Sequence, residues 1–278
     1  MKTHTLLALF VFALAGFAAA QNVEWTYTID SPGSAPTLFP NEQQPSGIVI
    51  SAGKSVVRLD GKGGKVWQTD LPVSAATPAT VADIDMDESV ESVVALADGA
   101  VVCLGQDGQV RWKHDFDTPG GGFKMLVAAE LTPRKGLEIL AGFDDGWLNC
   151  LSAQGELLWR FYGDRFRVGG IAVGCVDGDK VPEILFGTDN GHIYCLDSFG
   201  RVQWRYSELA PYGRSGPNLA DLNGDGKAEV LITRSNVGNA TCLMALDAGT
   251  GKFLWRTNDV MQGYVSNAVV DLEGDGVS

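Results

Sequence analysis

Six of the seven tryptophans in this chain of 278 residues recur at nearly constant intervals. They are Trp25, Trp67, Trp112, Trp159, Trp204 and Trp255, separated by 42 to 51 residues. An acidic segment keeps the same step and opens at Asp83, Glu130, Cys175, Asp221 and Asp271. Two markers in phase indicate a repeat protein. The repeats are rich in Val, Ile, Gly and aromatic residues and lack helical periodicity, so a period of about 40 to 50 residues predicts the four-stranded blades of a β-propeller.

The repeats divide the chain into five blades and the beginning of a sixth. We place the blades at residues 31–71, 75–116, 122–163, 167–208 and 217–256. Blade one has an irregular, proline-rich start, and the sixth begins with the stretch DLEGDG at 271–276. We therefore expect an all-β propeller whose complete ring, of seven or eight blades, needs residues beyond these.

The segment VEWTYTI at 23–29 contains Trp25 but no preceding inner strands. We expect it to be the outer strand of a closing blade whose other strands come from the far end of the chain. Such closure removes an exposed sheet edge.

The first twenty residues have the layout of a secretory signal peptide: Lys2, an apolar run at 6–17, then three alanines. We expect a mature propeller domain at 21–278 in an exported protein, periplasmic or extracellular. No later apolar segment is long enough to predict a membrane span. The net charge of −13 argues against a nucleic-acid partner.

Five cysteines in an exported chain suggest disulfides. However, Cys103, Cys150 and Cys195 each precede the tryptophan of their blade by nine residues, and blade five has Ala245 in that place. Equivalent positions on neighbouring blades should be too far apart for a bond. We therefore predict three free, buried thiols, and a pair involving Cys175 or Cys242 stays open.

One stretch carries a family resemblance. Residues 245–255, ALDAGTGKFLW, fit A-x-D-x-x-T-G-x-x-x-W, and 196–204 and 59–67 are partial copies. This pattern resembles the tryptophan-docking motif of PQQ-type, quinoprotein-like β-propellers. The resemblance implies that each tryptophan joins two blades. It does not imply quinone chemistry, since many such propellers carry no cofactor.

The sharpest chemical signal is the loop DLNGDGKAE, which begins at Asp221. It places side-chain oxygens at positions 1, 3, 5 and 9 and a backbone carbonyl at position 7, a set of hard oxygen ligands that suits calcium. The ligands would be Asp221, Asn223, Asp225, Lys227 through its carbonyl, and Glu229. The loop is similar to the calcium loops of FG-GAP repeats. A solvated acidic turn is the alternative.

Aligned copies of this loop range from complete to broken. Blade two offers Asp83, Asp85, Asp87 and Glu91, although Glu88 replaces the turn glycine. Blade four offers Asp177, Asp179 and Glu183 behind Cys175, and the sixth blade begins Asp271, Glu273, Asp275. Blade three has Arg134 where a metal ion would sit, so we expect it to be metal-free.

Connections between blades supply a second candidate site. They bring basic and aromatic residues to comparable positions, which we expect at one mouth of the central channel: Phe123, Lys124, Arg165, Arg167, Tyr212, Arg214 and Tyr264. Such residues suit an anionic or sugar-like ligand. Ordinary solvated loop residues are the alternative. For His114 and His192 we expect surface roles.

The sequence contains no G-x-S-x-G, C-x-x-C, Walker or H-E-x-x-H pattern. We therefore expect a non-enzymatic binding or scaffold module, stabilised by calcium, for a protein or carbohydrate partner. The alternatives are a PQQ-dependent alcohol or sugar dehydrogenase and the accessory propeller of a larger exported enzyme. The chain has no adjacent cysteine pair, which such dehydrogenases often place beside the quinone, so PQQ is not expected.

Overall fold

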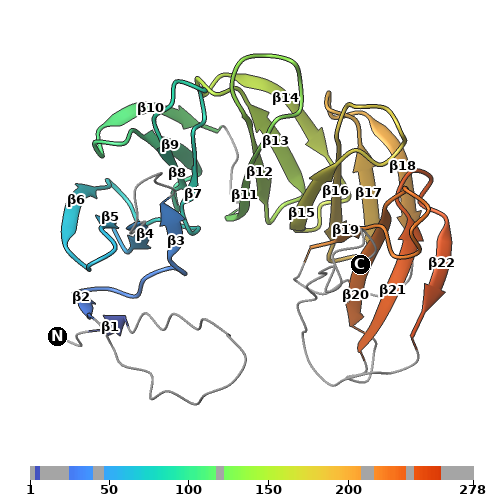
Figure 1. The fold of residues 1–278 in the computed structure, drawn as a ribbon, viewed down its shortest axis with the longest axis horizontal. Coiled ribbons are helices and arrows are strands. Elements are labelled where there is room, and N and C mark those ends of the chain that lie inside the picture. Colours follow the sequence, from blue (N-terminus) through green and yellow to red (C-terminus); the bar gives the residue numbers. More distant parts are fainter. Residues whose placement is uncertain are drawn as a thin grey trace. The chain divides into compact units, whose positions relative to one another are not determined.

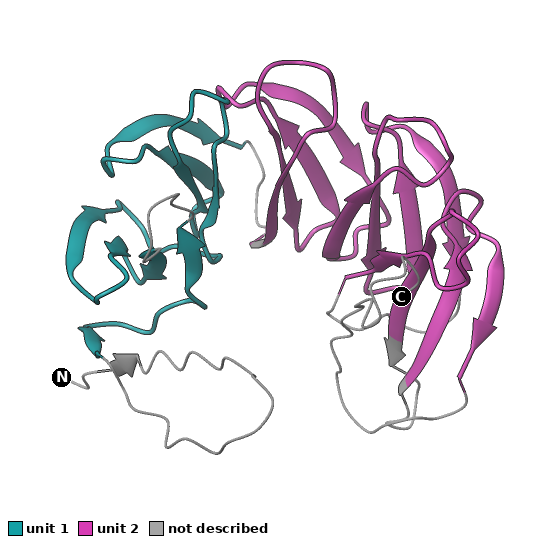
Figure 2. Ribbon diagram, viewed as in Figure 1, with its two compact units in different colours: residues 1–117 teal, residues 118–278 magenta. Residues whose placement is uncertain are grey.

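The computed structural model describes residues 4–6, 25–39, 47–116, 122–207, 216–235 and 241–257. All regular structure in these ranges is β-strand, as predicted (Figure 1). The chain forms two compact units, residues 1–117 and 118–278 (Figure 2). Within the described ranges, no helix is long and apolar enough to cross a membrane.

Unit 1 contains two four-stranded antiparallel sheets, which are blades one and two. Blade one runs β3-β4-β5-β6: Thr37–Phe39, Gly47–Ala52, Ser55–Leu59 and Lys65–Asp70. Blade two runs β7-β8-β9-β10: Thr80–Ala82, Glu91–Ala95, Ala100–Leu104 and Val110–Asp115. Both sheets follow chain order, so each blade is built from one repeat. The inner strand of blade one, β3, lies in the proline-rich stretch that the sequence pattern left unassigned.

Unit 2 contains blades three, four and five. Blade three runs β11 to β14: Phe123–Ala129, Glu138–Phe143, Trp147–Leu151 and Leu157–Tyr162. Blade four runs β15 to β18: Val168–Gly174, Glu183–Thr188, His192–Leu196 and Val202–Ser207. Blade five runs β19 to β22: Asn218–Ala220, Glu229–Ser235, Thr241–Asp247 and Phe253–Arg256. The five predicted blades are confirmed, each within its expected range.

Apolar cores fill the space between consecutive blades of a unit. In unit 1, Val49 and Val56 of blade one pack with Val94 and Val102 of blade two. In unit 2, separate cores join blade three to four and blade four to five. The middle strands are therefore buried on both faces, as β8 and β9 are throughout, whereas outer strands such as β10 alternate exposed and half-buried residues. Short Val, Ile and Ala runs suit such doubly covered strands.

The segment around Trp25 lies outside the four-stranded sheets. Its strand β2 (Tyr27–Ile29) pairs only with β1 (His4–Leu6) among the described strands. Trp25 and Tyr27 pack against Ile48, Ile50 and other residues of blade one. The segment thus lies against blade one and is not the inner strand of that blade, while its role as the outer strand of a closing blade stays a prediction. The expected sixth blade and most of the signal-like segment lie outside the described residues.

Docked tryptophans join successive blades. The indole N–H of Trp159 donates to the carbonyl of Ser198 in the last turn of blade four, at 3.0 Å, and Trp204 donates to Ala248 of blade five, also at 3.0 Å. In unit 1, Trp67 donates to Gln106 at 2.9 Å, and Trp25 donates to Gly61 at 3.2 Å. Each ring lies over a glycine of the turn that it meets.

Two constraints, the backbone conformation and the closeness of the ring, require glycine under each tryptophan. Gly200 has φ +78°, in the left-handed region, and a Cβ there would lie 2.6 Å from the Trp159 ring. Gly63, Gly108 and Gly251 have the same conformation under Trp25, Trp67 and Trp204. A side chain at this position would both strain the backbone and displace the ring.

Gly200→Ala should therefore destabilise the protein more than Gly178→Ala. Gly178 also has a left-handed φ of +90°, but a Cβ there would meet nothing within 4 Å. Both changes add backbone strain of about 1–2 kcal/mol, and only Gly200→Ala adds a clash with a ring, about 1–3 kcal/mol more. Urea unfolding with chelator present measures the difference. Equal losses for the two variants would contradict this account of docking.

Candidate functional site

The strand order places two sets of loops at opposite ends of each blade. Strands alternate in direction, so the first-to-second loop and the third-to-fourth turn lie at one end. The acidic loops and the tryptophan-docking turns share that end. The second-to-third turn and the connector to the next blade lie at the other end, where the sequence predicts a ligand site.

The ninth residue of every described acidic loop is a buried glutamate with a structural role. Glu91, Glu138, Glu183 and Glu229 are between 2% and 5% exposed. In each case Oε2 accepts the backbone N–H of the second loop residue, at 2.8 to 2.9 Å. One carboxylate oxygen therefore anchors the loop to its strand in all four blades, including blade three, where no metal is expected. Sequence reasoning assigned this glutamate only as a metal ligand.

The third loop residue distinguishes the blades from one another. In blade three, the Thr132 hydroxyl donates to Glu138 Oε1. In blade five, Asn223 Nδ2 donates to Glu229 Oε1 at 3.2 Å. These two loops thus satisfy both oxygens of the buried glutamate with hydrogen bonds from the protein.

Blades two and four have an aspartate at this third position and cannot do the same. Ligand atoms of Asp83, Asp85 and Glu91 gather within 4.8 Å of one another, as do those of Asp177, Asp179 and Glu183. Asp85 Oδ1 is buried and has no hydrogen-bond partner in the described part of the chain. A carboxylate cannot donate a hydrogen bond when ionised, so these aspartates cannot satisfy the glutamate as Thr132 and Asn223 do.

The pKa shifts agree with this crowding. Burial, and then the charges of Asp85, Asp87 and Asp83, raise the pKa of Glu91. Burial, and then Asp177 and Asp179, raise the pKa of Glu183. Converging oxygen ligands around an unsatisfied buried oxygen fit a hard cation such as calcium.

The loop at Asp221 is organised differently, although its sequence is the most complete. The Asp221 carboxylate accepts backbone N–H groups from Gly224 and Gly226, both at 2.8 Å, and from two further loop residues. Burial opposes its ionisation, but these donors outweigh burial and hold the pKa of Asp221 below its usual range. Its three carboxylates do not converge as those of blades two and four do. The metal ligands expected at 271–275 lie outside the described residues.

The loop of blade two keeps this backbone without its glycines. Met86 and Glu88 adopt φ +58° and +72° where blade five has Gly224 and Gly226. The N–H of Glu88 donates to Asp83 Oδ2 at 3.0 Å, matching that of Gly226 to Asp221. The backbone of the blade-two loop therefore follows the same course as that of blade five, although Met86 and Glu88 are strained in this conformation.

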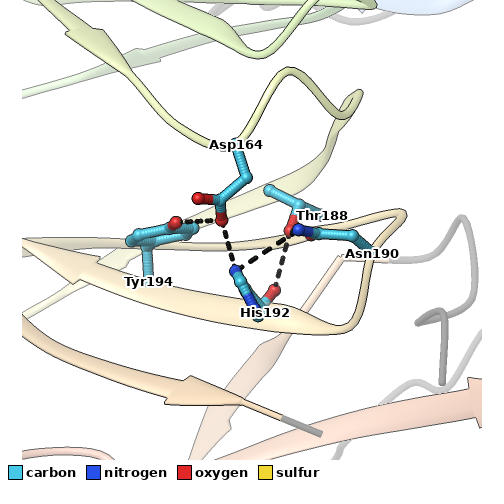
Figure 3. A network of polar contacts seen from close by, with 5 residues as sticks. All are labelled: Asp164, Thr188, Asn190, His192 and Tyr194. Atoms are coloured by element: carbon cyan, nitrogen blue, oxygen red, sulfur yellow. Dashed lines mark hydrogen bonds and ion pairs between the residues drawn. The ribbon is translucent and has the colours of Figure 1, made fainter. Parts of the chain in front are cut away.

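At the opposite end of blade four, the connector from blade three closes over a polar cluster (Figure 3). His192 Nδ1 and the Tyr194 hydroxyl both donate to Oδ2 of Asp164 in the connector. Thr188 and Asn190 extend the cluster, and Arg167 pairs with Asp189 at 2.5 Å. The connector is thereby held to the turn between β16 and β17 at two points.

Hydrogen bonds decide the ionisation of this cluster. Burial favours the neutral form of Asp164, but the donors Tyr194 and His192 outweigh burial and lower the pKa of Asp164. Burial and the Asp164 carboxylate raise the pKa of Tyr194 to about 12. The carboxylate is thus held ionised between two donors.

The fold itself does not require this cluster, because other blades lack it. The cross-strand position of His192 and Ser207 is occupied by Ser55 and Asp70 in blade one and by Ala100 and Asp115 in blade two. Our expectation of a surface role for His192 was wrong, since its side chain is only 21% exposed and tied to Asp164. Asp117 stands at the same distance from Trp112 as Asp164 does from Trp159, but it lies outside the described residues. The histidine and tyrosine that meet Asp164 have no such counterparts in blade two, where Ala100 and Val102 take their places, so the repeat pattern did not mark the cluster.

Only part of the predicted ligand set can be placed. Arg165 is exposed on the connector, and Arg167 is held by Asp189. Phe123 and Lys124 lie in β11, but their side chains are not among those described. Tyr212, Arg214 and Tyr264 lie outside the described residues. Cys103, Cys150, Cys195 and Cys242 are free and buried, and Cys175 is free and exposed, so the thiol prediction is confirmed.

Two family models match parts of the chain. Residues 144–277 match the model described as outer membrane protein assembly factor BamB, and residues 52–120 match the λ-carrageenase β-propeller domain. The fold is that of a PQQ-type propeller. A λ-carrageenase of Pseudoalteromonas sp. is 30% identical over 112 residues, which are 40% of this chain and 11% of that protein. The chain thus corresponds to a small part of that relative.

Solved structures share the fold at low identity. BamB from Moraxella catarrhalis superposes with a TM-score of 0.61 and 19% identity, over 87% of this chain and 69% of BamB. Quinohemoprotein alcohol dehydrogenase from Comamonas testosteroni superposes with a TM-score of 0.55 and 17% identity, over 76% of this chain and 41% of the enzyme. The same blades thus occur in both an assembly factor and an oxidoreductase, so the fold does not decide the function.

The Asp164 cluster makes a pH-dependent contribution to stability. Because the pKa of Asp164 is lowered on folding, this contribution is present above the ordinary aspartate pKa and is lost as pH falls through the folded value. Asp164→Asn should cost about 1–2 kcal/mol near neutral pH, and this cost should shrink as pH falls below the ordinary aspartate pKa towards the lowered folded value. Urea unfolding at a series of pH values from 7 downwards measures the change. Asp189→Asn, which changes a more exposed carboxylate, is the control, and a loss that is independent of pH would contradict the assignment.

Proposed function

We propose that this chain is an exported, non-enzymatic propeller, stabilised by calcium, that binds a protein or carbohydrate partner through its connector face. The observation that carries the calcium part is the unsatisfied, buried Asp85 Oδ1 beside Glu91 and Asp83. The signal-like residues 1–20 support export.

Calcium would be held by Asp83, Asp85, Asp87 and Glu91 in blade two and by Asp177, Asp179 and Glu183 in blade four. Burial of Glu91 and Glu183 supports both assignments, since a buried carboxylate beside another is costly without a counter-ion. The loop that begins at Asp221 is a third candidate on its sequence, with ligands Asp221, Asn223, Asp225 and Glu229. The bound ion would neutralise the carboxylates and fix the loop beside the docking turns.

Binding on the connector face is supported by what the connector presents. Arg165 and Phe166 are exposed there, and the Asp164 cluster and the Arg167 ion pair hold the backbone on either side of them. A rigidly held, exposed segment loses little conformational entropy when a partner binds. The face therefore suits recognition better than a solvated loop would.

Calcium and protons should compete at blade two. The raised pKa of Glu91 means that its ionised form is disfavoured in the folded state, so the metal-free protein gains stability as pH falls from 7.5 through that raised pKa. Calcium at a hundredfold excess over its Kd adds roughly 2.7 kcal/mol per site. Thermal unfolding should therefore show a calcium-dependent stabilisation at pH 7.5 that shrinks at pH 5. A chelator that leaves the pH 7.5 unfolding curve unchanged would exclude structural calcium.

Two reciprocal substitutions sharpen this test. Asp85→Asn copies the arrangement of Asn223 in blade five, which gives Glu91 a donor, so it should stabilise the chelated protein and reduce its calcium response. Thr132→Asp copies Asp85 into blade three and should destabilise the chelated protein. Arg134→Ala, in the loop predicted to be metal-free, should leave the calcium response intact.

The binding proposal excludes quinone chemistry in a measurable way. PQQ and calcium added to the protein should give no bound-quinone absorption band and no dye-linked oxidation of alcohols or sugars. A quinohemoprotein alcohol dehydrogenase serves as the positive control. Turnover by this chain would replace the binding role with that of a dehydrogenase.

A second candidate is an accessory propeller of a larger exported enzyme that acts on a polysaccharide. The match of residues 52–120 to the λ-carrageenase propeller domain favours it. Binding of a carbohydrate by the chain, without cleavage of it, is what both candidates require.

A further inference from the structure

Blade three carries a pair of aromatic rings where other blades carry small or polar residues. Trp147 opens β13 and Tyr162 ends β14, and the two are cross-strand partners. Their rings lie 4.6 Å apart with a tilt of 36°. The same position holds Ser55 and Asp70 in blade one, Ala100 and Asp115 in blade two, and His192 and Ser207 in blade four. The fold therefore does not require rings here.

The pair is partly open to solvent, with Trp147 half-buried and Tyr162 exposed. Tyr162 is 44% exposed, whereas its chain neighbour Phe161 packs against Phe186 and Tyr194 of blade four. A partly exposed aromatic pair gives up burial that would stabilise the fold, which suggests that a ligand covers it.

Charged residues lie on the strands that carry the rings and in the adjoining segments. The Arg160 guanidinium lies over the Trp147 ring, 5.9 Å from its centroid. Arg165 is exposed at the start of the next connector, and Asp145 lies in the turn before Trp147. The Arg160 guanidinium can thus bind an anion at the rings, and Arg165 and Asp145 supply a second guanidinium and a carboxylate from the adjoining segments.

The connector is held close to this platform. Arg165 has φ +62°, which is strained for a residue other than glycine. Gly146 permits the approach, since a Cβ there would lie 3.0 Å from the Arg165 nitrogen and 3.1 Å from that of Phe166. Arg165 and the 45% exposed Phe166 are therefore held beside the turn that leads into Trp147.

We propose that Trp147, Tyr162, Arg160 and Arg165 form a subsite for an anionic polysaccharide. This inference rests on the proposed binding function and names the class of its ligand. The C–H face of a pyranose ring packs on an aromatic ring while its hydroxyls stay hydrated, and the guanidinium groups pair with sulfate or carboxylate substituents. The net charge of −13 acts weakly here, because charges beyond about 8 Å are screened at physiological salt.

Affinity electrophoresis of the full chain tests this subsite, with λ-carrageenan as the sulfated galactan and dextran as the neutral control. Tyr162→Ala should weaken retention at least about tenfold, the equivalent of 1.4 kcal/mol, and Tyr162→Phe should keep it. Arg165→Ala should weaken retention and reduce its dependence on salt. Phe199→Ala, which removes a 58% exposed ring at the opposite end of blade four, should have no effect.

The outcomes separate the two proposals. Retention of the parent protein by λ-carrageenan that survives both Tyr162→Ala and Arg165→Ala would overturn the subsite and leave the binding function standing. Equal retention by dextran would overturn the anionic specificity. No retention by either polysaccharide would overturn the subsite. The calcium response of the same sample would then test, independently, the proposal of a calcium-stabilised propeller. Unfolding temperatures of all variants within about 2 °C of the parent exclude misfolding as the cause.

Discussion

The docking of a tryptophan over a glycine turn of the next blade is the interaction on which this structure depends. Each blade is a small sheet with apolar residues on both faces, and one repeat alone cannot bury those faces. The indole of Trp159 crosses to the turn of blade four and donates a hydrogen bond to Ser198, closing the edge of the apolar core between the two blades. Trp204 repeats this contact with blade five. The spacing of the tryptophans is therefore the spacing of the blades.

The sequence predicts the parts of the structure that recur. Blade number, strand order and buried thiols follow from markers in phase, because a repeated pattern indicates a repeated environment. Individual contacts between blades do not follow in this way. Asp164 and His192 are 28 residues apart and meet only because a connector crosses the end of blade four. The position of His192 holds Ser55, Ala100 and Trp147 in blades one to three, so the repeat pattern does not record this pair.

The acidic loops illustrate a different limit of sequence reasoning. A count of possible oxygen ligands makes the loop at Asp221 the best calcium site, since this loop has the turn glycine and an oxygen at every ligand position. The structure instead brings carboxylates together where an aspartate, Asp85 or Asp177, holds the third position beside a buried glutamate. The sequence pattern counts Asn223 as a metal ligand. In this fold, however, its side-chain amide donates a hydrogen bond to the Glu229 carboxylate. Whether the third side chain can donate a hydrogen bond or only accept one decides whether the loop itself satisfies its buried glutamate. The spacing of the residues does not contain this information.

Docking also has a direction along the chain. Every docked tryptophan in the described cores reaches forward, and Trp204 meets a carbonyl 44 residues later. On a ribosome that adds about 5–20 residues per second, the ring waits roughly 2–9 s before its turn exists. During that interval the newest blade has an open apolar face, so it is the natural point for a chaperone to engage.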